Sequence, residues 1–208
     1  MEILGKLLGG IPRVKIMRLF LLNPDQLFEA AEVAERSRMQ SAIARRTVSQ
    51  LVGMTFVKKK SFVKEYLVRG KPKKKRVQGW MLDAEFPYIA ELKLLLIEGE
   101  FFKHADIAKR FRPAGRIHFL VISGIFIQNS ESRLDLLIVG DNLRKSHIQK
   151  TVSILESELG KELAYAVFET ADFNYRIAMY DKLLRDVFDY PHERLIASKD
   201  FSTFSLPN

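Results

Sequence analysis

The feature that most constrains this chain is a run of positive charge between Lys58 and Arg76. The run holds ten basic residues and a single acid, Glu65, whereas the rest of the chain holds 24 basic and 24 acidic residues. The whole net charge of +9 therefore lies in one segment. Because attraction to a polyanion depends on how charge is clustered, the sequence predicts a polyanionic partner. The basic residues of the run are Lys58, Lys59, Lys60, Lys64, Arg69, Lys71, Lys73, Lys74, Lys75 and Arg76.

The same run has the pattern of a β-hairpin. The stretch FVKKKSFVKEYLV is rich in β-branched and aromatic residues, RGKPK supplies Gly70 and Pro72 for a turn, and KKRVQGWML returns to extended character. We call residues 58–76 the basic ribbon. Such a ribbon can lay ammonium and guanidinium groups along phosphates and release their counterions. A solvated basic loop is the alternative interpretation of the charge alone.

Three helices are predicted before the basic ribbon. The first begins near Pro12, which suits an opening helical turn because the missing N–H is tolerated there. This helix ends at Asn23, since the residue before a proline is driven out of the helical region. A second short helix is expected over residues 29–37 and a third over residues 40–53.

The third predicted helix is amphipathic. One stripe is apolar and is expected to be buried, and it consists of Ala44, Val48, Leu51 and Val52. The opposite face carries short polar groups and guanidinium groups, which can contact base edges and phosphates when a helix enters a major groove. The residues expected to contact DNA from this helix are Gln40, Ser41, Arg45, Arg46, Ser49 and Gln50. An ordinary solvent-exposed polar face is the alternative.

The stretch ARRTVSQLVGMTFVKKK joins the third predicted helix to the ribbon, and here the sequence resembles winged helix-turn-helix domains of bacterial and archaeal transcriptional regulators. The resemblance covers roughly residues 10–85. It implies that the third helix reads the major groove of double-stranded DNA and that the ribbon is the wing that holds phosphates. Thr55 departs from the pattern, because a glycine commonly makes the turn between helix and wing. Some domains of this kind bind RNA or protein, so RNA is an alternative partner.

Residues 86–114 are predicted to form a helical connector. The apolar spacing indicates an amphipathic helix over residues 86–98, and EFFKHADIAKRF predicts a second helix after Gly99. The first of these helices packs either against its symmetry mate in a homodimer or under its own domain. Its apolar positions are Ile89, Leu92, Leu95 and Leu96. We expect His104 to be structural, because no other histidine is near enough in sequence to form a metal motif.

From Arg116 the pattern changes to that of a small α/β domain. A buried strand, IHFLVI, leads into Ser123-Gly124, and a second strand, RLDLLIVG, follows a short polar stretch. A helix over residues 143–159, a third strand LAYAVFE, a long helix and a terminal strand at residues 194–197 complete the order. The apolar stripe of the long helix consists of Phe173, Ile177, Tyr180, Leu184 and Phe188.

This order of elements, with LVISGIFI before RLDLLIVGDNL, resembles the minimal nucleotidyltransferase domain over roughly residues 115–197. In that family a Gly-Ser pair after the first strand holds the triphosphate. An Asp-x-Asp pair on the next strand binds magnesium, because two carboxylates neutralise the ion and let it hold the phosphate oxygens in line.

Carried over residue by residue, this resemblance fails at the positions that do chemistry. Gly124 matches the glycine, but Ile125 replaces the serine and Ser123 lies on the other side. Asp135 matches the second carboxylate, whereas Arg133 stands in the place of the first. A guanidinium has five donors and no acceptor, so it cannot ligate a cation. The resemblance therefore implies a pseudoenzyme without a catalytic metal or cofactor, whose domain serves dimerisation or effector sensing.

Two further roles stay open for this region. Ser123, Gly124, Arg133 and Asp135 are candidates for binding a nucleotide effector. Arg133 either forms a structural salt bridge with Asp135 or contacts an effector phosphate without metal. The alternative enzyme is an active nucleotidyltransferase that modifies a protein or RNA, and it would use Asp135 with Asp141 or Glu169 as its metal site.

The predicted fold class is therefore α+β. The expected parts are a winged helix over residues 1–85, the helical connector 86–114, a nucleotidyltransferase-like domain over 115–197 and a flexible tail over 198–208. The chain has no cysteine, which excludes disulfides and thiolate zinc sites and favours the cytoplasm. Its longest apolar run is too short to span a bilayer, so no membrane is expected as a partner. The expected partners are double-stranded DNA, a second copy of the chain and a nucleotide effector.

Overall fold

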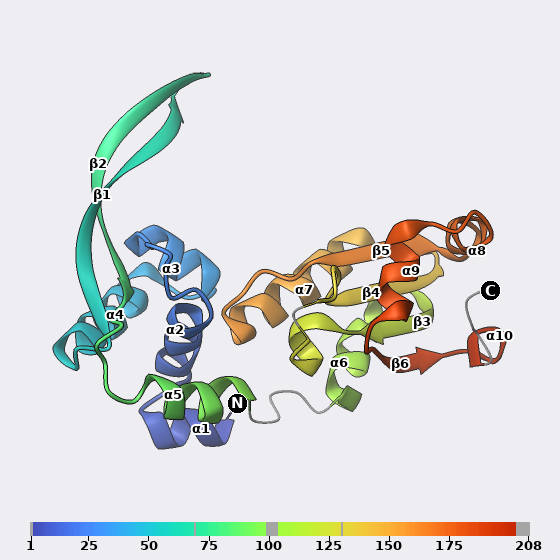
Figure 1. Ribbon diagram of the computed structural model, residues 1–208, viewed down its shortest axis with the longest axis horizontal. Coiled ribbons are helices and arrows are strands. Elements are labelled where there is room, and N and C mark those ends of the chain that lie inside the picture. The colour runs from blue at the N-terminus through green and yellow to red at the C-terminus, as the bar shows by residue number, and fades with distance from the viewer. Residues whose placement is uncertain (1, 69, 99–103, 130, 203–208) are drawn as a thin grey trace. The chain divides into compact units, whose positions relative to one another are not determined.

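The computed structural model describes residues 2–68, 70–98, 104–129 and 131–202. The chain divides into two compact units, of which the first comprises residues 1–101 with 154–161 and the second residues 102–153 with 162–208 (Figure 1). Each unit combines helices with a small sheet, so the α+β class is confirmed. Every helix in the described ranges is too short or too polar to cross a membrane.

The first unit contains the three predicted helices and the predicted hairpin. Their bounds are α2 (Ile11–Leu22), α3 (Ala30–Arg36), α4 (Ser41–Gly53), β1 (Val57–Val68) and β2 (Lys71–Leu82). Pro12 lies in the first turn of α2, and Asn23 caps its end, as the sequence predicts. A short helix that the sequence analysis did not predict, α1 (Glu2–Leu8), precedes them.

Helix α2 is the centre of the first unit's core. Its buried side chains include Val14, Leu19 and Phe20, each at most 1% exposed. They pack in one cluster with the buried stripe of α4 and with Phe56 at the entry to β1. Three of the four stripe residues predicted for α4 are fully buried, and Val52 is partly buried. The helices and the base of the ribbon therefore form a single packed body.

A buried charge in α2 was not predicted. Arg18 is 2% exposed, and its Nε donates to the carbonyl of Leu96 at 3.0 Å while its Nη1 donates to the carbonyl of Glu158 at 2.9 Å. Burial lowers the pKa of the guanidinium to about 10, against the opposing influence of Glu158. The hydrogen bond to Glu158 ties the segment 154–161, which comes much later in the chain, into the first unit.

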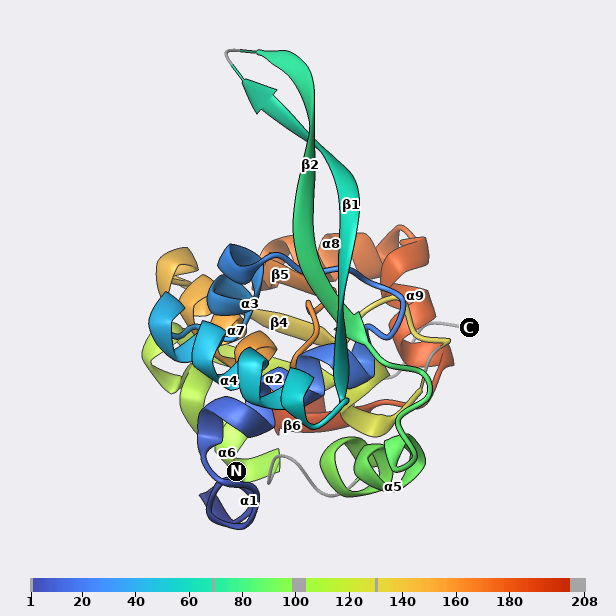
Figure 2. The same ribbon diagram turned by 90° about the vertical axis from the view of Figure 1, so that its left-hand side faces the viewer.

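The basic ribbon is a long antiparallel hairpin. Twelve residues of β1 pair with twelve of β2, from Val57↔Leu82 at the base to Val68↔Lys71 at the tip. At about 3.4 Å per residue the strands are roughly 40 Å long, and Figures 1 and 2 show the ribbon projecting beyond the helices of its unit. Pro72, predicted in the turn, instead lies in β2 opposite Leu67. Arg69 lies outside the described residues.

The turn between α4 and β1 has the geometry of a Schellman motif. The amide of Thr55 donates to the carbonyl of Val52 and the amide of Phe56 to that of Leu51, both at 3.0 Å. Thr55 has φ +59°, the left-handed conformation that usually belongs to glycine at this position. The residue that departs from the winged-helix pattern therefore adopts a conformation that its Cβ disfavours.

A short bridge fixes the base of the ribbon to the loop before α3. Phe28 and Trp80 exchange two backbone hydrogen bonds of 2.9 Å. A Cβ atom at Gly79 would lie 2.7 Å from the Phe28 carbonyl oxygen and 2.8 Å from the Phe62 ring. Only glycine permits this approach of two backbones, so Gly79 is required where it stands.

The connector differs in part from its prediction. Its helical segments are α5 (Ile89–Lys93), a π-helical turn η1 (Leu94–Glu98) and α6 (His104–Phe111), while residues 99–103 lie outside the described ranges. Leu96 is fully buried as predicted, but Leu95 is 42% exposed. The change of helical period at Leu94 turns Leu95 out of the stripe that a regular α-helix would bury. The side chain of His104 lies outside the description.

The second unit is built on a mixed sheet of strand order β5-β4-β3-β6. β3 pairs antiparallel with β4 and β6, and β4 pairs parallel with β5. Alternate side chains of the central strands, such as Phe119 and Leu120, point to opposite faces, and both sets are buried. The elements of this unit are β3 (Arg116–Ile122), β4 (Leu136–Asp141), β5 (Tyr165–Glu169), α8 (Thr170–Ala178), α9 (Lys182–Asp189), β6 (Glu193–Ala197) and α10 (Lys199–Ser202), with 3-10 turns η2 (Arg112–Ala114) and η3 (Gly124–Ile127). Helix α7 (Lys145–Leu159) begins in this unit, and its residues from Ile154 on belong to the first unit.

The long last helix predicted for this unit is in fact two helices. α8 ends at Ala178 and α9 begins at Lys182, because Tyr180 has φ +56° and Asp181 caps the second helix by accepting from the amides of Leu183 and Leu184. Tyr180 is 51% exposed, so its place in the buried stripe was wrong. The segment expected to be a tail begins with α10, whose Phe201 is buried in the core of this unit.

Candidate nucleic-acid interface

The register of the hairpin sorts the ribbon cations into two faces. Side chains opposite one another across antiparallel strands share a face, and neighbours along a strand alternate. The pairs Lys64↔Lys75 and Tyr66↔Lys73 lie on one face, whereas Lys59↔Trp80 and Glu65↔Lys74 lie on the other. The first face carries Lys58, Lys60, Lys64, Lys71, Lys73 and Lys75, and the second carries Lys59, Lys74 and Arg76.

Most of these cations extend into solvent. The exposed ribbon cations without an ion pair in the described part of the chain are Lys59, Lys60, Lys71, Lys73, Lys74, Lys75 and Arg76. Lys58 differs, because its Nζ lies 2.9 Å from Asp83 Oδ1. The outer half of the hairpin is therefore a dense array of ammonium groups, whereas cations nearer the base are partly neutralised by carboxylates.

Four side chains hold the middle of the ribbon to α3, and we call them the ribbon anchor: Glu29, Glu32, Lys64 and Tyr66. Lys64 Nζ lies 3.0 Å from Glu29 Oε1 and 2.6 Å from Glu32 Oε1. The Tyr66 hydroxyl donates to Glu29 Oε1 at 2.6 Å. Glu32 also accepts from the backbone amide of Glu29 at 2.8 Å, within the capping box that begins α3. The same carboxylates therefore start the helix and fix the direction of the ribbon.

The anchor shifts the titration of its members in consistent directions. The hydrogen bond from Tyr66, aided by Lys64, lowers the pKa of Glu29 below its usual 4.5. The hydrogen bond to Glu29 raises the pKa of Tyr66 above its usual 10.0. Hydrogen bonds to Glu32 and Glu29 raise the pKa of Lys64. The anchor thus keeps Glu29 ionised, Tyr66 protonated and Lys64 charged across the neutral range.

The predicted recognition face of α4 is accessible. Gln40 precedes the helix, and Ser41, Arg45, Arg46, Ser49 and Gln50 lie along it, all of them exposed. Arg13 of α2 modifies this surface, because its Nη2 donates to Gln50 Oε1 at 2.9 Å. Arg13 was not singled out in the sequence, since no local pattern pairs it with a residue 37 positions away.

In the second unit, the carboxylate of Asp135 is occupied by backbone amides. Oδ1 accepts from the amide of Ile125 and Oδ2 from the amide of Ala164, both at 2.8 Å. Gly124 has φ +55°, and a Cβ there would overlap Asp135 Oδ1. Asp135 therefore holds together the turn after β3, the start of β4 and the approach to β5. Its two carboxylate oxygens, which a cation would need as ligands, instead accept hydrogen bonds from backbone amides.

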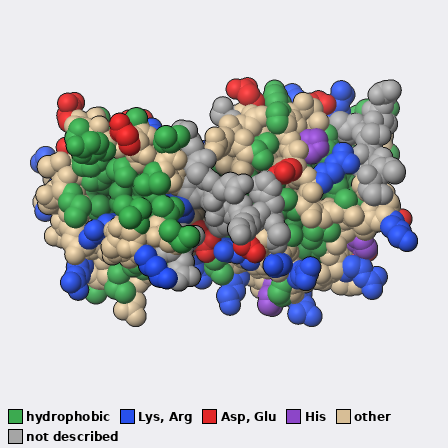
Figure 3. Space-filling view, turned by 90° about the horizontal axis from the view of Figure 1, so that it is seen from below, with side chains coloured by type: hydrophobic (Ala, Val, Ile, Leu, Met, Phe, Trp, Pro, Cys, Tyr) green, Lys and Arg blue, Asp and Glu red, His purple; other side chains and the backbone are tan. Residues whose placement is uncertain are grey.

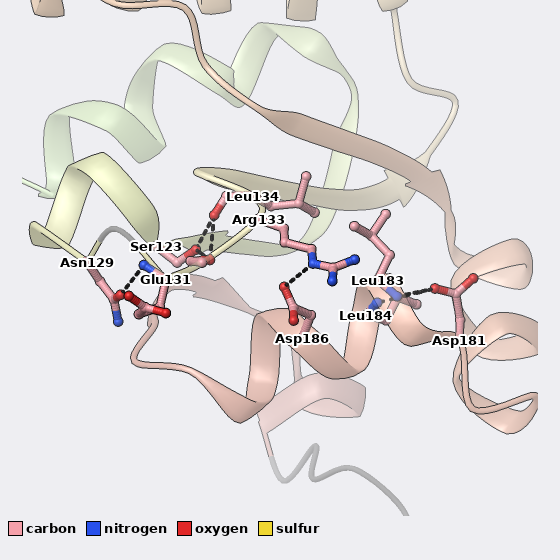
Figure 4. Close-up of polar contacts among 10 residues, drawn as sticks. Ser123, Asn129, Glu131, Arg133, Leu134, Asp181, Leu183, Leu184 and Asp186 are labelled. Carbon is pink, nitrogen blue, oxygen red and sulfur yellow. Dashed lines mark hydrogen bonds and ion pairs between the residues drawn. The ribbon is translucent and has the colours of Figure 1, made fainter. Parts of the chain in front are cut away.

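Ser123 is committed in the same way. Its side chain is 2% exposed, and its hydroxyl donates to the Leu134 carbonyl and pairs with Ser132 Oγ at 2.8 Å (Figure 4). Its amide donates to the Asp135 carbonyl at 3.0 Å. The structure thus brings Ser123, Gly124 and Asp135 together, but these polar groups bind one another.

Arg133 points away from this group. Figure 4 shows its guanidinium directed at Asp186 of α9, and Nε lies 3.5 Å from Asp186 Oδ2. The suggested salt bridge between Arg133 and Asp135 is therefore wrong, because backbone amides occupy Asp135 and Asp186 supplies the partner. The Arg133 side chain is 58% exposed, so its outer donors face solvent.

The other carboxylates considered for a metal site lie elsewhere. Asp135 precedes β4 and Asp141 ends it, a separation of roughly 20 Å along a strand. Asp141 Oδ2 lies 3.0 Å from His118 Nε2, and the neighbouring Thr170 and His118 lower the pKa of Asp141. Glu169 lies opposite Gly140, at the Asp141 end of the sheet. Asp135 cannot share one ion with either residue.

No protein-family model, curated protein or solved structure matches the chain. The resemblances to winged helices and to nucleotidyltransferases therefore rest on this chain's own residues.

Proposed function

We propose that the chain binds double-stranded DNA with sequence preference and regulates transcription, its first unit acting as a winged helix-turn-helix domain. The observation that carries the proposal is the array of seven exposed ribbon cations that have no ion pair in the described structure. Like charges held this close repel one another, and phosphates that neutralise them remove the repulsion and release counterions. A surface of this kind is suited to a regular polyanion.

The distribution of cations over both faces supports binding within a groove. Lys73 and Lys75 leave one face of the hairpin, and Lys74 and Arg76 leave the other. A ribbon that touched a single phosphate strand would use only one face. When the ribbon lies along a groove, the phosphates on the two sides of that groove can meet its two faces.

Sequence preference is assigned to α4. Arg45 and Arg46 are exposed on this helix, which leads directly into β1. Arginine forms bidentate hydrogen bonds with guanine in the major groove, and short polar side chains such as Ser49 contact bases or phosphates. In this proposal the helix reads bases and the ribbon supplies affinity that does not depend on sequence. The chain acts as a homodimer on two related half-sites.

The second unit is proposed to resemble a minimal nucleotidyltransferase in fold but not to transfer nucleotides. Support comes from Asp135, whose two oxygens accept backbone amides, and from Arg133 at the position of the other carboxylate. A unit of this kind serves dimerisation or effector sensing. Incubation of the whole chain with labelled nucleoside triphosphates and magnesium should give no labelled product, and transfer to a protein or RNA would contradict this part of the proposal.

The proposal is tested by electrophoretic shift of the whole chain on pooled random DNA duplexes at low salt. Binding is expected, and selection of the bound duplexes should recover a palindrome. Arg45→Ala and Arg46→Ala should relax the preference at single positions with a cost of about 1–3 kcal/mol on the selected duplex. Absence of binding at low salt would refute DNA recognition, and tighter binding to duplex RNA of equal length would reassign the ribbon to RNA.

A further inference from the structure

A groove with an apolar floor lies in the first unit between α1, the end of α4 and Phe86. Its volume is about 420 Å³, which falls in the range of roughly 300–1,000 Å³ that is usual for small-molecule sites. The floor includes Met17, Leu51 and Phe56, which are at most 6% exposed. Apolar contact with a ligand is therefore available along the bottom of the groove.

The rim of the groove exposes large apolar side chains to solvent. Leu7 is 69% exposed and Met54 is 50% exposed, and both line the groove. Figure 3 shows hydrophobic side chains gathered on this face of the first unit, with Lys and Arg side chains at the edge of the patch. Exposed patches of this kind mark places where an apolar ligand or partner binds.

A guanidinium at the groove wall supplies the polar end of the site. Arg13 Nη1 donates to the Leu8 carbonyl at 3.2 Å and Nη2 donates to Gln50 Oε1 at 2.9 Å. Arg13 Nε is buried and has no hydrogen-bond partner within the described residues. A buried donor without an acceptor is unfavourable, and a carboxylate is the group that accepts from two guanidinium nitrogens at once. Lys6 lines the same groove and adds positive charge.

We propose that this groove binds an amphipathic carboxylate, with its carboxylate on Arg13 and its aliphatic or aromatic tail on the floor formed by Met17, Leu51 and Phe56. The charge at one end and the apolar floor along the rest match an acid with a hydrophobic tail. The site lies in the first unit and is separate from the effector role considered for the second. A carboxylate that accepts the hydrogen bond from Arg13 Nη2 frees the side chain of Gln50 on α4. Ligand binding would therefore change the surface of the helix that the proposed function assigns to base reading.

Decanoate is the probe, and its binding to the whole chain is measured by isothermal titration calorimetry without nucleic acid. We expect saturable one-to-one binding, with decanamide at least about tenfold weaker because it lacks the charge. Arg13→Gln should weaken decanoate by about tenfold or more, whereas Arg185→Gln on α9, which removes the same charge elsewhere, should leave it unchanged. Met54→Glu, which leaves the hydrogen bonds of Arg13 in place, should also weaken binding. Thermal unfolding checks that each variant is folded.

Three results would overturn the proposal. They are absence of saturable binding at millimolar decanoate, equal affinity of the Arg13→Gln variant, and sedimentation showing a dimer that Leu7→Glu dissociates while decanoate does not bind. The last result would assign the groove to a second copy of the chain. Because no DNA is present, failure of this site is distinguishable from failure of DNA recognition.

Discussion

Replacement of Asp135 by asparagine tests whether this residue is structural or part of a metal site. The carboxylate accepts two backbone amides at 2.8 Å, from Ile125 and Ala164. Hydrogen bonds to a charged acceptor contribute about 1.5–3 kcal/mol each. Asparagine keeps one acceptor oxygen but turns an NH₂ group toward the other amide, so about one bond is lost. The free energy of unfolding of the second unit should fall by about 1.5–3 kcal/mol, or roughly 10 °C in Tm.

The chain offers a way to follow each unit separately. Its one tryptophan, Trp80, lies in the first unit, so fluorescence follows that unit while circular dichroism follows both. Asp172→Asn is the matched control, because Asp172 is 47% exposed in an i,i+4 pair with Arg176 and should cost less than about 1 kcal/mol. One result would refute the reasoning: the native chain binds nucleotide in the presence of magnesium, and Asp135→Asn abolishes this binding while its stability is unchanged.

Three further predictions concern the ribbon and its base. Thr55→Gly should raise the free energy of unfolding by about 1 kcal/mol in urea titrations, since it removes the left-handed strain at φ +59°; a loss of stability would contradict the turn geometry. Gly79→Ala should cost about 1–3 kcal/mol through its clash with backbone, whereas Gly53→Ala, where a Cβ meets nothing within 4 Å, should be neutral or stabilising. The hydrogen bond between Tyr66 and Glu29 should persist above pH 4.5 and below pH 10.0, because Glu29 titrates lower and Tyr66 higher than usual. The contribution of this hydrogen bond to stability is lost as the pH falls through the pKa of Glu29 or rises through that of Tyr66. Ultraviolet titration of the native chain against Tyr66→Phe measures the pKa of Tyr66, and an unshifted tyrosine titration would contradict the prediction.

Much of the first unit was predictable because its signals are local. The helices α2 and α4 follow from apolar spacing, and the hairpin follows from the β-branched and aromatic residues on either side of Gly70. Thr55 was identified as unusual from its position alone, and its positive φ agrees with that. Patterns of apolar, β-branched and turn residues over a few positions predict helices and strands well, because these patterns arise from contacts within the element or at its ends.

The features that were missed depend on residues far apart in the chain. Lys64 was counted with the phosphate-binding cations, but Glu32 of α3 already pairs with it across 32 positions. Arg133 was paired with its near neighbour Asp135, whereas its partner Asp186 comes from α9. The π-helical turn that exposes Leu95 leaves no mark in apolar spacing. Side-chain pairing between distant elements depends on packing, which a single sequence does not record.

The salt dependence of DNA binding tests the central claim most directly. A labelled duplex is titrated with the whole chain by fluorescence anisotropy over a series of salt concentrations. Replacing Lys73, Lys74 and Lys75 together by glutamine should reduce the slope of log K against log salt by about 2.7, at about 0.9 per phosphate contact. The matched control replaces three exposed cations of the second unit, Lys145, Lys150 and Arg185, and should change the slope by less than about one. Equal slopes for the wild type and the ribbon variant, or an equal loss in the control, would contradict the account.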